Sequence, residues 1–79
     1  MEADLREQLK KQVKGILNEY GLALLSKQWE NAESFVDEYP VRAFYIFGEP
    51  GYGDVAILTD NLLIDVEGDE KQSKGNTSI

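Results

Sequence analysis

Apolar residues recur at intervals of three and four positions through the first quarter of the chain. This spacing places them on one side of an α-helix, and the Glu, Lys, Gln and Arg residues between them are good helix formers. The pattern therefore predicts an amphipathic helix over residues 2–20. Its apolar stripe consists of Leu5, Leu9, Val13, Ile16, Leu17 and Tyr20.

A second apolar stripe follows the first. On one straight helix it would lie roughly 140–150° around the axis from the first stripe, so the two halves would bury opposite sides. A break at Asn18–Gly21, with Gly21 as a left-handed cap, lets two helices fold back as a hairpin, and Pro40 ends the second helix. The alternative is one continuous helix that pairs with another chain. The second stripe consists of Leu22, Leu25, Trp29, Ala32, Val36 and Tyr39, and Trp29 is expected in the core.

Beyond Pro40 the pattern changes to short runs rich in β-branched and aromatic residues, which are typical of strands. The predicted fold class is α+β: an N-terminal helical hairpin packed on a three-stranded antiparallel β-meander, in a single domain at residues 1–67. The polar residues that follow, 68–79, are expected to be a flexible tail. The strands are predicted at 41–47, 54–59 and 62–67, with a Gly- and Pro-rich turn at 48–53.

The segment 53–68 predicts a hairpin rather than a binding site. Asp60 and Asn61 are expected to form its two-residue loop, since both residue types tolerate left-handed geometry. Apolar and polar positions alternate after the loop, as they do in a strand with one exposed face. One side of that strand carries Leu62, Ile64 and Val66, and the other carries Leu63, Asp65 and Glu67.

The run at 41–47 is apolar on both sides of the predicted strand. We expect Tyr45 and Phe47 in the core, and Phe44 and Ile46 on the other side as a partner-binding interface. If the helices cover only one face, the other exposes a patch large enough for dimerisation or partner binding. Because a small chain without disulfides or zinc has a small core, we expect a homo-oligomer.

Cysteine and histidine are both absent from the 79 residues, which excludes several kinds of chemistry. Without them the chain has no thiol nucleophile, thiolate metal site or imidazole acid–base. No spacing among its carboxylates, lysines, serines and tyrosines forms a catalytic pattern. We therefore expect a protein that is not an enzyme and that has no cofactor or metal; a carboxylate-based enzyme is a third alternative.

The formal net charge is −7, and the charges are unevenly distributed. Basic residues gather at 6–14, whereas twelve acids lie between Glu19 and Glu70 with only Lys27 and Arg42 opposing them. This distribution argues against direct binding of nucleic acid or of an anionic membrane. It favours a protein partner with a basic surface.

The second predicted helix carries a group of acids with little basic compensation nearby. They form either a solvated face or a ridge that imitates nucleic-acid phosphates on a rigid helix. An acidic inhibitor or nucleic-acid mimic that blocks a basic site on a partner is therefore the alternative function. The acids, which we include among the predicted partner-binding residues, are Glu30, Glu33, Asp37 and Glu38.

Two short segments superficially resemble ligand-binding loops. The segment 48–53 lacks the Lys and Ser/Thr of a phosphate-binding loop and contains Glu49, so it predicts a β-turn with Tyr52 at its exposed tip as an interface anchor. The segment 65–70 holds four acids, but Gly68 falls at position four rather than position six of a calcium loop. Neither segment predicts a cofactor or metal site.

The N-terminus is charged, and no apolar segment approaches the length that spans a bilayer. We expect no signal peptide and no membrane association. The lack of cysteine is in keeping with a cytoplasmic location.

The segment Leu58-Thr59-Asp60-Asn61-Leu62-Leu63-Ile64 shows a strand that ends in Leu-Thr-Asp and turns tightly into the next. In this respect residues 53–79 resemble part of bacterial pleckstrin-homology-like domains, in which a polar loop and a further strand follow. That family has more strands than the three expected here, and a C-terminal helix. The resemblance implies a scaffold for protein or lipid-headgroup contact rather than catalysis.

These patterns together predict a small, acidic, non-catalytic protein–protein interaction module that self-associates. Its contacts are expected on the sheet face that carries Phe44 and Ile46, or at the 48–54 loop with Tyr52.

Overall fold

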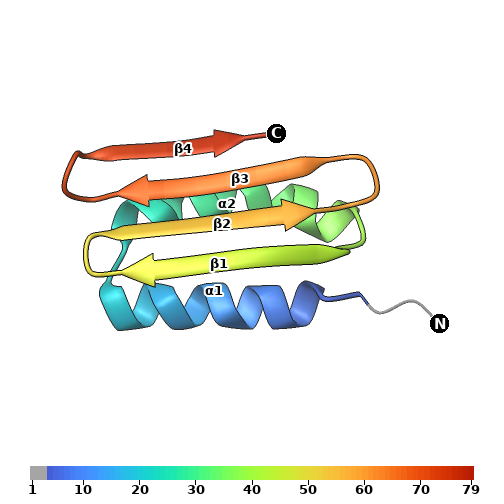
Figure 1. Ribbon diagram of the computed structural model, residues 1–79, viewed down its shortest axis with the longest axis horizontal. Coiled ribbons are helices and arrows are strands. Elements are labelled where there is room, and N and C mark those ends of the chain that lie inside the picture. The colour runs from blue at the N-terminus through green and yellow to red at the C-terminus, as the bar shows by residue number, and fades with distance from the viewer. Residues whose placement is uncertain (1–3) are drawn as a thin grey trace.

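The computed structural model describes residues 4–79 and has two layers, with helices on one side of an antiparallel sheet (Figure 1). The chain begins with helices α1 (Arg6–Tyr20) and α2 (Ala23–Glu38). Four strands follow as a meander: β1 (Ala43–Glu49), β2 (Tyr52–Leu58), β3 (Leu63–Asp69) and β4 (Lys74–Ser78). The α+β class and the antiparallel meander are confirmed, but the sheet has four strands rather than three.

Gly21 separates the two helices, as predicted. It adopts left-handed geometry with φ 59°, and its N–H donates to the Leu17 carbonyl at 2.9 Å. This is the usual way in which glycine ends a helix, because it has no Cβ to clash. The helical hairpin is therefore confirmed and the continuous helix is wrong. Positions 2 and 3 of the first predicted helix lie outside the described residues.

Both apolar stripes face one core between the helices and the sheet. Trp29 is only 7% exposed, so its predicted place in the core is confirmed. Helix α1 lies against β1, and α2 lies mainly against β3 and β4. The largest fully buried side chains come from both helices, from the α1–α2 and α2–β1 connections and from the two central strands: Leu9, Val13, Leu22, Leu25, Val36, Val41, Val55, Ile57, Ile64 and Val66.

Four glycines lie side by side across the sheet, one in each strand. The strand register pairs Gly48 with Gly53, Gly53 with Gly68, and Gly68 with Gly75. A Cβ at Gly68 would lie 2.4 Å from the backbone nitrogen of Leu25 in α2, and one at Gly53 would lie 2.6 Å from a Leu25 methyl group. This row of small residues therefore allows the first turn of α2 to approach the sheet closely.

The β2–β3 hairpin has the two-residue loop predicted from the sequence, Asp60-Asn61. The flanking residues close it, with the N–H of Thr59 donating to the Leu62 carbonyl at 2.9 Å. The expected left-handed geometry is wrong, because Ser73 is the only non-glycine residue with positive φ in the range 4–79. The Thr59 hydroxyl stabilises the loop instead, by accepting the N–H groups of Asn61 at 3.3 Å and Leu62 at 3.0 Å.

The polar end of the chain forms a turn and strand β4, where a flexible tail was expected. Strand β4 pairs with β3 from Asp65–Ser78 to Asp69–Lys74. The Thr77 hydroxyl also contacts α2, where it lies 3.2 Å from the backbone oxygen and 2.8 Å from the side-chain oxygen of Gln28. The prediction failed because this strand lacks apolar alternation, and backbone pairing and the contact with α2 hold it in place.

Candidate functional site

The face of the sheet that points away from the helices is the candidate site, and we call it the open face. Directly paired residues in an antiparallel sheet share a face, so the register arranges the open-face residues in rows. At the end where β1 begins, the row is Ala43, Leu58 and Leu63. The next rows are Tyr45, Ala56, Asp65 and Ser78, then Phe47, Asp54, Glu67 and Asn76, then Glu49, Tyr52, Asp69 and Lys74.

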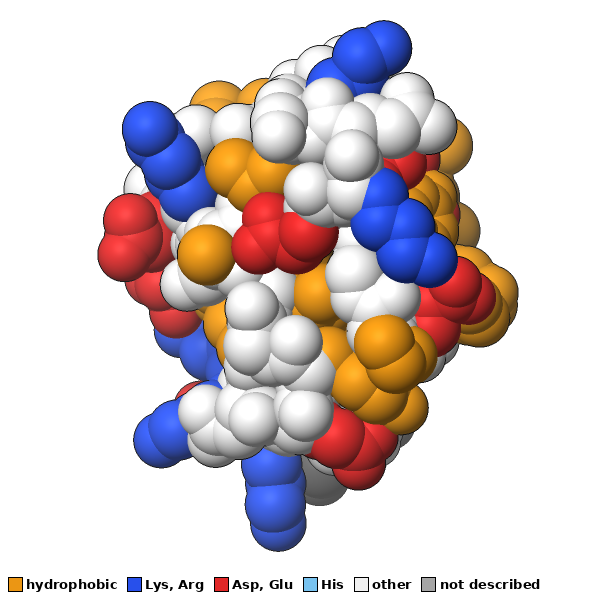
Figure 2. All heavy atoms as spheres, turned by 90° about the vertical axis from the view of Figure 1, so that its left-hand side faces the viewer, with side chains coloured by type: hydrophobic (Ala, Val, Ile, Leu, Met, Phe, Trp, Pro, Cys, Tyr) orange, Lys and Arg blue, Asp and Glu red, His pale blue; other side chains and the backbone are white. Residues whose placement is uncertain are grey.

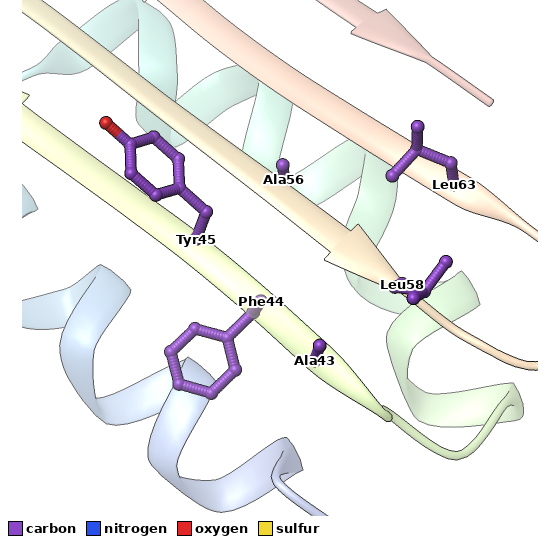
Figure 3. A pocket seen from close by; sticks show the side chains of 6 residues that line it. All are labelled: Ala43, Phe44, Tyr45, Ala56, Leu58 and Leu63. Atoms are coloured by element: carbon purple, nitrogen blue, oxygen red, sulfur yellow. The ribbon is translucent and has the colours of Figure 1, made fainter.

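One half of the open face is apolar and exposed. The exposed fraction is 57% for Tyr45, 47% for Leu58 and 63% for Leu63. Figure 3 shows Leu58 and Leu63 next to one another on neighbouring strands, with Tyr45 further along β1. A shallow hollow of about 220 Å³ is lined by Ala43, Phe44, Tyr45, Ala56, Leu58 and Leu63. Large apolar side chains gathered on one surface are typical of a contact site.

The other half of the open face is acidic. Asp54 in β2 lies directly opposite Glu67 in β3, and Asp65 is one row away. Burial raises the pKa of Asp54 to about 6, and a hydrogen bond with Asp65 and the nearby charges of Asp65 and Glu67 contribute in the same direction. These three carboxyl groups therefore form a cluster on the outward side of β2 and β3.

Tyr52 lies at the end of the open face away from Leu58 and Leu63, in the row next to Phe47 and Glu67. It lies in β2 rather than at the loop tip where it was expected; the tip is Pro50-Gly51, and Gly51 has φ 85°, as in a type II turn. The Tyr52 hydroxyl donates to Glu67 at 2.7 Å, and its ring centre is 6.0 Å from that of Phe47. The bond to Glu67 raises the pKa of Tyr52. Tyr52 is therefore a predicted partner-binding residue that does lie on the open face.

Phe44 and Ile46 point toward the helices, so the predicted faces of β1 are reversed. Both side chains are partly buried against the core. The hairpin register explains this, because Phe44 pairs with Ile57 and Ile46 with Val55, and both partners are fully buried. Strand β1 is also an edge strand of the sheet. The side of β1 expected in the core is exposed and carries Tyr45 and Phe47.

Sequence reasoning placed Leu63 on the outward side of its strand but missed the exposed residues Tyr45 and Leu58, although a signal for them was present. The acids Asp54 and Asp65 mark the outward side of β2 and β3. A two-residue Pro-Gly loop sets the pairing register between β1 and β2. That register shows which residues of β1 lie on the same outward side as Asp54. The error arose because β1 itself is apolar on both sides and offers no internal clue.

The four predicted acids of α2 lie on the other side of the molecule from the open face. Lys10 of α1 forms an ion pair with Asp37 and lies 4.0 Å from Glu33. The hydrogen bond to Asp37 raises the pKa of Lys10. Lys10 thus lies within 4.0 Å of two of the four acids, Glu33 and Asp37.

Other kinds of site find little support in the structure. Over residues 4–79, no three or more acidic side chains are placed to hold a metal ion, and no helix combines the length and apolar character needed to cross a membrane. Figure 2 shows the end of the molecule with the β1–β2 and β3–β4 turns, where basic and acidic side chains are interspersed. The open face carries exposed apolar side chains next to a group of acids.

No family model matches this chain, and neither a curated protein nor a solved structure matches it significantly. These comparisons give no support to the resemblance to bacterial pleckstrin-homology-like domains. A functional proposal must therefore rest on the open face itself.

Proposed function

We propose that this protein is a small, non-catalytic protein-binding module that contacts its partner through the open face. The observation that carries the proposal is the exposure of Tyr45, Leu58 and Leu63 beside a group of carboxylates. Burying apolar surface contributes about 25 cal/mol per Å². Tyrosine is also among the residues that dominate binding energy at interfaces.

Two alternatives derived from the sequence are less well supported. An acidic inhibitor that uses the α2 ridge would have to displace Lys10 from Glu33 and Asp37. Self-association remains a prediction, and it would now have to use Tyr45 and Leu63 rather than Phe44 and Ile46.

Site-specific photo-crosslinking in the cells that make the protein tests the proposal. A photoreactive amino acid is placed at Leu63 on the open face or, as the control, at Ser34 on the exposed side of α2. We expect one or a few discrete crosslinked products from position 63 and none of these from position 34. Their mass identifies them as another protein or as a second copy of this chain.

A position-63 product that disappears in a Tyr45→Ser background would support the open face as the contact surface. Equal crosslinking from both positions, or none from position 63, would overturn the proposal. Circular dichroism of each variant establishes that the fold is intact.

A further inference from the structure

We infer that the open face binds a basic amphipathic α-helix of another protein. This inference rests on the protein-binding function proposed above and names the chemistry of the partner. Three observations support it: the dimensions of the face, the order of apolar and acidic side chains across it, and the carboxylates that a second copy of this chain would bury there.

The dimensions of the open face suit one helix. Strands lie about 4.8 Å apart and a helix is about 10–12 Å wide, so a helix laid along the strands covers two or three of them. Strands β1 and β2 have seven residues each, or about 23 Å, which is the length of about 15 helical residues. A helix in this position would cover the face of the sheet that α1 and α2 leave open.

The order of side chains across the face defines the chemistry of that helix. Along β1 and β2 it would meet the exposed apolar side chains of Tyr45, Phe47 and Leu58. It would also meet Asp54, which lies in β2 between Phe47 and Glu67. Its flank toward β3 would lie over Asp65 and Glu67, which follow one another on the outward side of that strand. A complementary helix therefore has an apolar stripe with Lys or Arg along one flank, and the charges would fix its direction and speed its association.

A second copy of this chain is a poor occupant of the whole face. Two copies stacked face to face are related by a two-fold axis that lies between the sheets. If the axis runs along the strands, the acidic rows with Asp54 and Glu67 oppose each other. If it runs across them, the apolar row with Leu58 and Leu63 opposes the row with Tyr52 and Asp69. Both arrangements bury Asp54 and Glu67 with no cationic side chain in the opposing row, which is unfavourable.

Three synthetic peptides of 15 residues provide defined probes. The first has leucines along one helical stripe and lysines on one flank, with alanine elsewhere. The second replaces the lysines by glutamates, and the third keeps the first composition but scatters leucines and lysines so that no stripe forms. Binding to the full chain is measured by fluorescence anisotropy. We expect the first peptide to bind at least ten-fold more tightly than either of the others.

Two pairs of charge-removing substitutions test on which surface of the protein the basic peptide binds. The double substitution Asp65→Asn with Glu67→Gln removes two negative charges from the open face, and Glu30→Gln with Glu38→Gln removes two from the far side of α2. We expect the first pair to weaken the binding of the basic peptide five-fold or more and to reduce the salt dependence of that binding. The second pair should change the affinity by less than two-fold. Equal effects of the two pairs would show binding to net charge alone and overturn the inference.

The remaining outcomes separate this inference from the function on which it rests. If position 63 crosslinks another protein but the basic peptide binds no better than the scattered one, the helix is wrong and the binding module stands. If light scattering over a dilution series shows a dimer that Tyr45→Ser with Leu63→Ser dissociates, the occupant is a second copy and the inference is wrong. If position 63 crosslinks nothing, the binding module itself fails.

Discussion

The carboxylate of Glu70 accepts the backbone N–H of Ala23 at 2.8 Å, and so caps the start of α2 from the β3–β4 turn. The same oxygen lies 3.3 Å from the N–H of Leu24. The residue at the helix start, Leu22, has no side chain that can serve as a cap. A carboxylate in this position satisfies free N–H groups and interacts favourably with the helix dipole.

Replacing the cap should destabilise the fold. We expect Glu70→Ala to lower the free energy of unfolding by about 1 kcal/mol, as measured by urea denaturation. Glu70→Gln should cost less, because its amide oxygen can still accept a hydrogen bond. The control is Gln72→Ala on the same turn, an exposed position where we expect a change below about 0.5 kcal/mol. An equal loss from the two alanine variants would contradict the capping role.

Replacement by alanine should have opposite effects at Gly68, where α2 approaches the sheet closely, and at Gly15 in α1. Gly68→Ala should cost about 2 kcal/mol or more, because its Cβ would meet the Leu25 backbone at 2.4 Å and backbone cannot move aside easily. Gly15→Ala should instead stabilise by about 0.5–1 kcal/mol, since this position is in α1 with no atom within 4 Å of the added Cβ. Thermal denaturation of both variants measures the two effects, and a neutral Gly68→Ala would show that the contact is loose.

Asp54 predicts a specific pH dependence of stability. Its pKa in the folded protein, about 6, lies above the ordinary value of 3.8, so the folded state binds its proton more tightly than the unfolded state does. The stabilisation from this proton is complete below pH 3.8 and is lost as the pH rises through about 6. Asp54→Asn should therefore be more stable than the unsubstituted protein at pH 7.5, by about 1 kcal/mol because the group is only partly buried.

The comparison of the two proteins isolates Asp54 from the other carboxylates. The difference in unfolding free energy should shrink toward zero at pH 4, where Asp54 is protonated in the folded state. A difference that stays constant between pH 4 and pH 7.5 would show that Asp54 does not titrate in this range.

The contact between Thr77 and Gln28 predicts that β4 is part of the cooperative fold. Thr77→Val removes the hydroxyl at nearly constant shape, and we expect a loss of about 1 kcal/mol together with faster hydrogen exchange of β4 amides. The neighbouring substitution Asn76→Val, on the open face, should change the stability by less than about 0.5 kcal/mol. If both variants exchange as slowly as the unsubstituted protein, the hydroxyl contributes nothing to holding β4.

Most of the helices and strands follow from local patterns along the chain. The two stripes that begin at Leu5 and Leu22 cannot share one straight helix, so the break at Gly21 follows from helical periodicity alone. The Asp60-Asn61 loop and the alternation after it follow from local turn chemistry and the two-residue period of a strand. These features depend on neighbours in the chain, which a sequence displays directly.

Three features depend instead on contacts between distant parts of the chain. These are the choice of which face of β1 is buried, the pairing of the polar end with β3, and the cap of α2. Phe44 and Tyr45 are both aromatic, so their burial depends on the register with Val55 and Ile57 rather than on their own pattern. Strand β4 and the Glu70 cap depend on partners far away in the chain, Gln28 and Ala23. The open face exists because both helices pack on the same side of the sheet, and no local pattern specifies that choice.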